Sequence, residues 1–123
     1  MVIRDATDNR ASLDDVLRRL NQEYAQRGRF YPDSDGVRAA AEEVMRQSGA
    51  GAKADLSEFF RRYVAGTDPL PYNEWLSVAG LTLNAAAGRY AVVDVAQPNE
   101  RQRRVLANWL SGKPAAAAAA GER

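Results

Sequence analysis

Three acidic groups in this sequence have residue types that could bind a cation or transfer a proton. Asp33-Ser34-Asp35-Gly36 carries the oxygen ligands of a calcium loop, but its glycine comes two residues earlier than an EF-hand loop needs it. Asp14-Asp15 and Glu42-Glu43 are adjacent carboxylates, whereas paired acid catalysis needs two carboxylates that converge on one cleft. Neighbours on a helix diverge by about 100°. We therefore interpret all three groups as helix caps and solvated faces.

The residue types that are missing limit the chemistry further. The 123 residues include no histidine and no cysteine. Imidazole is the commonest zinc ligand and the usual general base near neutral pH. Ser-His-Asp and Cys-His triads and the His-Glu-x-x-His zinc motif are therefore impossible in this chain. Only carboxylates, lysine or tyrosine could do acid–base work, so a self-contained hydrolase is not expected.

The charge balance gives no reason to expect a nucleic acid or a membrane as partner. Seventeen basic residues stand against sixteen acidic ones, for a net charge of +1. We interpret the arginines as solvated faces and local ion pairs rather than a phosphate site. No apolar run approaches the ~18 residues of a membrane span, and the N-terminus does not resemble a signal peptide. Without cysteine the sequence leaves the cellular compartment undecided.

Most of the chain has helical periodicity. Ser12 and Asp15 predict a capped helix whose apolar stripe runs from Leu13 to Tyr24 and which Gly28 ends. A loop through Phe30, Tyr31 and Pro32 leads to a second cap at Asp33 or Ser34. The helix after it has a narrow apolar stripe, formed by Val37, Ala40, Ala41, Val44 and Met45.

Two further helices are predicted before residue 81. Asp55-Leu56-Ser57-Glu58 is typical of a capping box and opens a third helix with an aromatic face, formed by Leu56, Phe59, Phe60, Tyr63 and Val64. Gly66 ends that helix, Thr67-Asp68-Pro69 makes a turn, and Pro71 suits the start of a short helix that ends at Gly80. This structural interpretation needs every residue of the segment except Thr67, Asp68 and Tyr72.

The pattern changes after Gly80. Leu81 to Leu83 and Tyr90 to Val95 are typical of two short strands, with Ala85 to Gly88 as their connection. Pro98 then begins a last helix, which Gly112 ends and in which Val105, Leu106, Trp109 and Leu110 share one side. We expect Trp75 and Trp109 to be core residues.

The sequence thus predicts a mostly α protein, a compact array of four to five helices with a short β-hairpin before the last helix. Residues 1–112 form a single helical domain in this prediction. The remainder, 113–123, is an alanine-rich tail that we expect to be disordered.

Two segments carry a family resemblance. Phe59 to Leu81 combines a double aromatic, a Gly-Thr-Asp turn, two prolines, a tyrosine, a tryptophan and a closing Gly-Leu, and Ile3 to Arg18 carries Ser12-Leu13-Asp14-Asp15. In this order the two segments resemble the C-terminal helical region of the glycyl-aminopeptidase family, which are thermolysin-like zinc metallopeptidases. The resemblance covers about residues 2–83, with weaker similarity from 89 to 112. The family's zinc motif, its third zinc-ligand glutamate and its catalytic tyrosine lie upstream of this region and match no position here.

The resemblance implies a role for the chain and for its partners. The chain would be the non-catalytic C-terminal subdomain of a peptide-hydrolysing aminopeptidase, with no catalytic residue, metal or cofactor of its own and with zinc in the parent protein. Its main partner would be the upstream catalytic domain, and Thr67, Asp68 and Tyr72 would lie at the rim of the substrate cleft. Many members carry a PDZ domain before the last helix, but residues 82–88 are far too few for one.

The alternative is a free-standing helical protein-interaction module without catalytic activity. A subdomain separated from its parent should expose a contiguous apolar patch, around Leu13, Phe30 or Trp75, and could form a homodimer through it. A stand-alone module should have a polar surface. An enzyme that uses only carboxylates, lysine and tyrosine is a third hypothesis, and it would need a deep pocket with convergent titratable groups.

Overall fold

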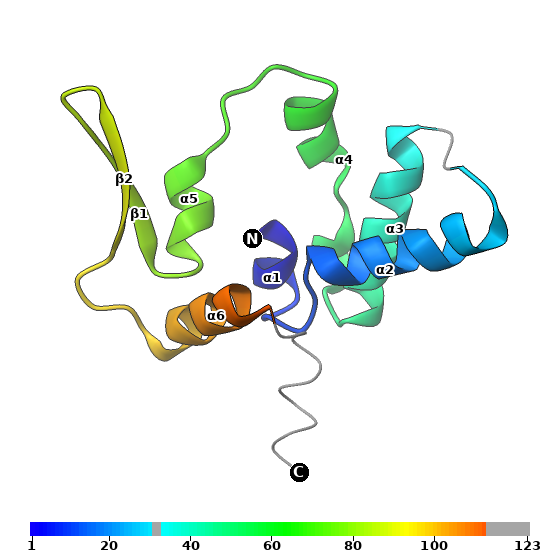
Figure 1. The fold of residues 1–123 in the computed structure, drawn as a ribbon, viewed down its shortest axis with the longest axis horizontal. Coiled ribbons are helices and arrows are strands. Elements are labelled where there is room, and N and C mark those ends of the chain that lie inside the picture. The colour runs from blue at the N-terminus through cyan, green and yellow to red at the C-terminus, as the bar shows by residue number, and fades with distance from the viewer. Residues whose placement is uncertain (31–32, 113–123) are drawn as a thin grey trace, which may run out of the picture.

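The computed structural model describes residues 1–30 and 33–112. The predicted loop positions Tyr31 and Pro32 and the predicted tail, 113–123, lie outside these ranges. The described part is mostly α-helical, with one two-stranded hairpin before the last helix, as the sequence predicts. Figure 1 shows the helices and the hairpin arranged in an open arc, with the N-terminal helix in the middle of that arc.

Six α-helices lie in the described ranges, so the prediction of four to five was too low. They are α1 (Val2–Ala6), α2 (Leu13–Glu23), α3 (Ser34–Gln47), α4 (Ser57–Phe59), α5 (Tyr72–Ser77) and α6 (Glu100–Ser111). Short 3₁₀ turns, Ala25–Arg27 and Gly51–Ala54, follow α2 and α3. The sequence missed α1 because its five residues have no side-chain cap and are too few to show a periodic stripe.

The predicted helix starts are largely confirmed. At α2 the Asp15 carboxylate accepts a hydrogen bond from the Ser12 backbone N–H at 2.8 Å, and at α3 the Asp33 carboxylate accepts from the Asp35 N–H at 3.0 Å. The Asp55 carboxylate likewise accepts from the Ser57 N–H at 2.8 Å, at the start of α4. The reciprocal half of that predicted capping box does not form, because Glu58 pairs with Arg61 instead.

The third predicted helix changes its winding after one turn. Residues Phe60–Val64 form a π-helical turn, in which the Ala65 N–H donates to the Phe60 carbonyl oxygen at 2.8 Å. The predicted aromatic face is only partly buried: Leu56 is buried, Phe59, Phe60 and Tyr63 are half-buried, and Val64 is exposed.

The hairpin pairs β1 (Leu81–Ala86) with β2 (Arg89–Asp94) in antiparallel register, from Leu81 opposite Asp94 to Ala86 opposite Arg89. Its turn is Ala87-Gly88, shorter than predicted, and both residues have positive φ, 51° and 74°. This is the backbone of a type I′ turn, whose twist matches that of the paired strands. Every residue of β2 is exposed, and the hairpin projects from the arc (Figure 1).

The buried apolar residues form two clusters. The larger joins α2, α3 and the start of α4, and its members are Ala11, Val16, Ala40, Ala41, Val44, Met45, Ala50, Ala54 and Leu56. The smaller joins α5, β1 and α6 through Ala79, Leu81 and Val105. Met45 and Val105 are fully buried, each at 0% exposure. The narrow stripe predicted for α3 is thus confirmed as a core face.

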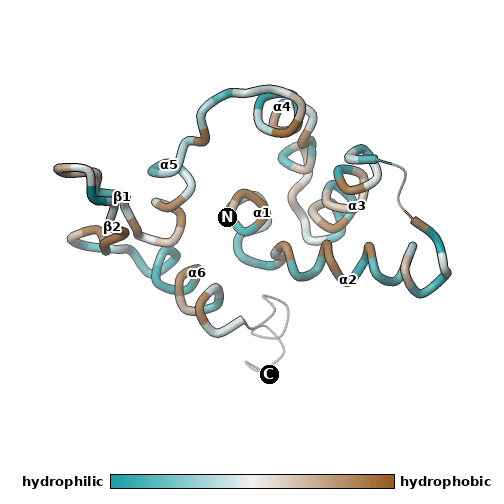
Figure 2. Tube along the Cα trace, turned by 45° about the horizontal axis from the view of Figure 1, so that its top comes forward, coloured by the Kyte–Doolittle hydropathy of each residue, from teal (hydrophilic) through white to brown (hydrophobic). Residues whose placement is uncertain are grey.

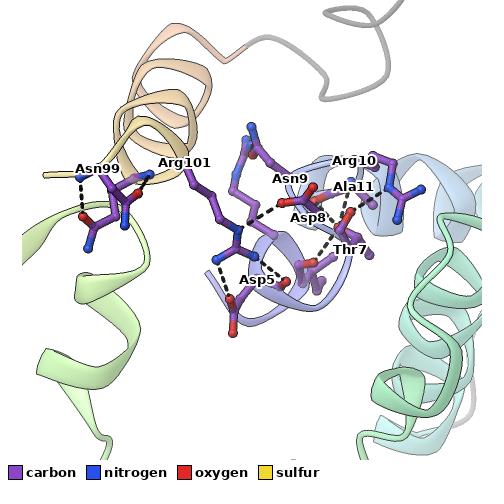
Figure 3. Close-up of polar contacts among 11 residues, drawn as sticks. Asp5, Thr7, Asp8, Asn9, Arg10, Ala11, Asn99 and Arg101 are labelled. Atoms are coloured by element: carbon purple, nitrogen blue, oxygen red, sulfur yellow. Dashed lines mark hydrogen bonds and ion pairs between the residues drawn. The ribbon is translucent and has the colours of Figure 1, made fainter.

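Two sets of contacts connect the clusters. On one side of the arc, the Trp75 ring of α5 lies 5.7 Å from the Phe59 ring and 5.3 Å from the Tyr63 ring. On the other side, α6 is joined to the N-terminal segment by Arg101, whose guanidinium pairs with Asp5 and Asp8 at 3.0 Å each (Figure 3). These two sets of contacts join the elements on both sides of α1.

Candidate functional site

The apolar stripe of α2 is more exposed to solvent than the core-facing side of a helix normally is. Of its residues only Val16 is buried, at 1% exposure. Leu13 and Leu17 are 61% and 54% exposed, and Leu20 and Tyr24 are half-buried. Phe30, which follows the helix, is 94% exposed. In these ranges of the chain, no element covers the stripe along its length.

An apolar cavity of about 260 Å³ opens beside the first turn of α2. We call it the central cavity. Its walls come from α1, α2, α3 and the aromatic cluster of α4 and α5, and include Ile3, Leu13, Val37, Phe59, Phe60 and Trp75. In Figure 2 the hydrophobic start of α1 lies in the middle of the arc, with the other elements around it. The central cavity has almost no polar lining, so it suits an apolar side chain rather than a polar substrate.

A groove of about 540 Å³ continues the apolar surface at the other end of α2. We call it the α2 groove. Leu17, Leu20, Tyr24 and Phe30 line it, and Arg29 lies over the Tyr24 ring with its guanidinium carbon 5.4 Å from the ring centre. The predicted patch around Leu13 and Phe30 is therefore exposed. The third predicted member, Trp75, is instead half-buried by its ring contacts with Phe59 and Tyr63.

The predicted rim residues Thr67, Asp68 and Tyr72 lie on the connection between the π-helical turn and α5, and all three are exposed. The Asp68 carboxylate accepts a hydrogen bond from Arg62 Nε at 2.9 Å, which fixes the loop to the preceding turn. Tyr72 is 54% exposed at the first position of α5. None of the three lines the central cavity or the α2 groove.

The tight approach at Gly66 explains why this loop begins with glycine. A Cβ built at Gly66 would lie 2.5 Å from the Arg61 carbonyl oxygen and 2.7 Å from that of Arg62. Only glycine lets the chain turn this closely over the last π-helical carbonyls. The segment from Gly66 to Tyr72 thus has the structural role that the sequence suggested, and its exposed side chains are free to face a neighbouring domain.

The ionisable groups of the described ranges form surface pairs rather than a catalytic set. The largest cause of the lowered pKa of Asp8 is its hydrogen bond from Arg101, and Arg46 and Arg61 lower the pKa values of Glu43 and Glu58 in the same way. Within residues 1–30 and 33–112 no three acidic side chains gather as ligands for a metal ion. The donor set that zinc prefers, histidine or cysteine, is absent from the whole sequence. The residues present therefore do not fit zinc.

One buried charge was missed by sequence reasoning. Arg4 is 5% exposed, and its Nη1 donates to the Asn9 side-chain oxygen at 2.7 Å. In the sequence Arg4 is one of seventeen basic residues on a polar segment, so nothing marks it as buried. Its burial depends on α1, which the sequence did not predict.

Comparison with known proteins gives this chain no relative. No family model, curated protein or solved structure matches it. Within the described residues no helix combines the length and apolar character needed to cross a bilayer. Any function has therefore to be argued from the chain's own residues.

Proposed function

We propose that this chain is the non-catalytic helical C-terminal subdomain of a glycyl-aminopeptidase-like zinc metallopeptidase. In that role it supports the peptide-hydrolysing cleft of an upstream catalytic domain. The parent would cleave peptide bonds with a zinc-activated water, and the zinc ligands and general base would all belong to the upstream domain. Two sequence segments, residues 3–18 and 59–81, carry the resemblance behind this proposal.

The uncovered stripe of α2 is the observation that carries the proposal. An amphipathic helix normally turns its apolar stripe toward a core, because leaving a leucine in water forgoes roughly 1.5–3 kcal/mol of burial energy. Leu13 and Leu17 remain more than half exposed, although the other face of α2 is polar. A second domain seated on the stripe, the central cavity and the α2 groove would bury these side chains.

The rim loop is consistent with the same arrangement. Thr67, Asp68 and Tyr72 are exposed, and the loop that carries them is fixed by Gly66 and by the Arg62–Asp68 pair. A fixed loop with exposed polar side chains can form one edge of a cleft whose other walls come from the catalytic domain. We therefore keep these residues as candidate rim positions.

The proposal is tested first by sequencing the source DNA upstream of Met1, in frame. The expected result is a His-Glu-x-x-His helix with a downstream glutamate. The segment so encoded would then be produced as a separate polypeptide and mixed with this chain, with binding measured by calorimetry. Leu17→Asp should weaken the complex about tenfold or more, whereas Gln22→Asp, on the exposed polar face of α2, should leave it within about twofold. A stop codon before Met1, or equal effects of the two variants, would contradict the proposal.

A free-standing interaction module is the second candidate, and the closure of the arc by Arg101 favours it. A chain whose last helix is tied to its first has contacts that hold it together without a parent. Such a module should be a monomer that unfolds cooperatively by itself. Sedimentation and thermal unfolding of the chain alone distinguish the two candidates: a cooperatively unfolding monomer supports the module, whereas a dimer that Leu17→Asp dissociates supports a subdomain separated from its parent.

A further inference from the structure

Arg4 lines a third cavity. Unlike the central cavity and the α2 groove, this cavity has charged side chains of both signs in its walls. It has a volume of about 320 Å³, and its walls include Ile3, Arg4, Ser12, Leu13, Asp14 and Trp109. The cavity lies between α1, the start of α2 and the last turns of α6. We call it the Arg4 cavity. Its size is at the lower end of the range for small-molecule sites.

Arg4 is a largely buried residue without a negative partner among the described residues. At 5% exposure, a positive charge is costly unless it is paired with an anion. Among the described residues, no carboxylate lies within 4.0 Å of Arg4, and its one side-chain hydrogen bond goes from Nη1 to the neutral Asn9 amide at 2.7 Å. Nε and Nη2 have no acceptor in these ranges. These two nitrogens form the edge of arginine that grips a carboxylate with two parallel hydrogen bonds.

A second feature of the cavity favours a negative charge. Ser12 caps α2, an 11-residue helix, and Leu13 and Asp14 are its first two residues. The first N–H groups of an α-helix lack intrahelical acceptors and carry the positive end of the helix dipole. Arg4 and the start of α2 therefore both favour an anion in this cavity.

The remaining walls limit the kind of anion. Ile3, Leu13 and Trp109 provide an apolar lining, while the Asp14 carboxylate places a negative charge at the same cavity. A doubly charged phosphate would be repelled by Asp14 about twice as strongly as a single carboxylate. A single carboxylate needs only one arginine edge, and its apolar substituent could lie against Trp109.

We propose that the Arg4 cavity binds a monocarboxylate attached to a small apolar group, as in an apolar amino acid with a blocked amine or the last residue of a peptide. Arg4 holds the carboxylate through Nε and Nη2, and the start of α2 adds a favourable field. Trp109 and Leu13 contact the apolar group. The cavity shares Leu13 with the surface that the proposed parent domain would cover, so its binding is tested on this chain alone.

The test is a titration of the whole chain followed by the NMR signal of the Trp109 indole N–H. N-acetyl-L-leucine should bind in the millimolar range and shift this signal, and N-acetyl-L-leucinamide should bind at least about tenfold more weakly because it lacks the charge. N-acetyl-Ala-Ala-Leu with a free carboxyl end tests the second source of the same chemistry. Binding of the peptide alone assigns the site to chain ends, and binding of both assigns it to single residues.

Variants separate a binding role from a structural one. Arg4→Gln should weaken binding about tenfold or more. Asp14→Asn removes a repelling charge and should tighten binding about twofold to threefold, an improvement that misfolding cannot imitate. Trp109→Ala lacks the indole signal, so its binding is measured by calorimetry and should be weaker, whereas Leu110→Ala, 74% exposed on the same helix, should bind normally. Equal affinity for acid and amide, no shift with any of the three compounds, or an unchanged affinity in Asp14→Asn would overturn the proposal.

Discussion

The Arg101 guanidinium donates through Nη1 to the Asp5 carboxylate at 3.0 Å and so joins residues that are 96 positions apart in the chain. Its Nη2 donates to the Asp5 backbone carbonyl at 2.9 Å, and its Nε donates to the Asp8 carboxylate at 3.0 Å. Figure 3 shows this side chain reaching from α6 to the end of α1. One arginine therefore ties the last helix to the first.

Arg101→Gln should loosen α1 more than it lowers global stability. The three bonds are solvent-exposed, so their loss should cost no more than about 1 kcal/mol of unfolding free energy. The five residues of α1 have no side-chain cap, so their amide hydrogens should exchange measurably faster in the variant. Arg103→Gln, an exposed position two residues along the same helix, is the control. Equal exchange rates in both variants would show that Arg101 does not fix α1.

Asp8 should give this contact a pH dependence. The hydrogen bond from Arg101 is the largest cause that lowers the pKa of the Asp8 carboxyl group. Since the folded-state pKa lies below the unfolded value of about 3.9, the stabilisation is present above that value and is lost as the pH falls through the folded pKa. Carbon-detected NMR titration should give an Asp8 pKa below that of an exposed aspartate, and Arg101→Gln should return it to the ordinary range. An unchanged pKa in the variant would contradict the assignment.

The hairpin turn should be improved by changing one residue. Ala87 has a φ of 51°, a left-handed conformation that costs energy for residues other than glycine, asparagine and aspartate. Ala87→Asn creates the Asn-Gly pair that type I′ turns prefer, and it should raise stability by about 0.5–2 kcal/mol. Ala85→Asn, in β1 opposite Tyr90, should be neutral or destabilising because asparagine is disfavoured in strands. In thermal melts, only Ala87→Asn should raise the melting temperature.

The larger cluster should depend strongly on Met45. This side chain is fully buried in α3, so Met45→Ala should lower the unfolding free energy by about 2–5 kcal/mol through lost burial and the cavity that remains. Met45→Leu keeps nearly the same volume and should cost less than about 1.5 kcal/mol. Urea unfolding of both variants tests this difference. Similar midpoints would mean that the cluster collapses around the smaller side chain.

Several elements follow from short-range chemistry and could be predicted from the sequence. The contact between Ser12 and Asp15, the Asp33 cap and the left-handed Gly112 that ends α6 involve residues only a few positions apart. The hairpin was also predicted, although β1 extends further, β2 begins one residue earlier, and the turn is tighter than the run of alanines suggested. Such features depend on local hydrogen bonds and backbone freedom, so the surrounding fold has little influence on them.

The burial of side chains could not be predicted in the same way. The apolar stripes that contain Val105 and Met45 do become core faces, but Trp109, which was also expected to be a core residue, is 45% exposed. A helical stripe shows only which side chains share a face. Whether that face is covered depends on distant parts of the chain or on another domain, and periodicity contains no information on either.

The sequence by itself determined the helix and strand types, their caps and the absence of histidine and cysteine chemistry. Only the tertiary structure decided that Arg4 is buried, that Arg101 ties α6 to α1, and that the apolar face of α2 is left open. The physical reason is the separation along the sequence of the residues that interact. Caps and turns form between neighbours along the chain, whereas burial and charge pairing form between residues that become neighbours only after folding.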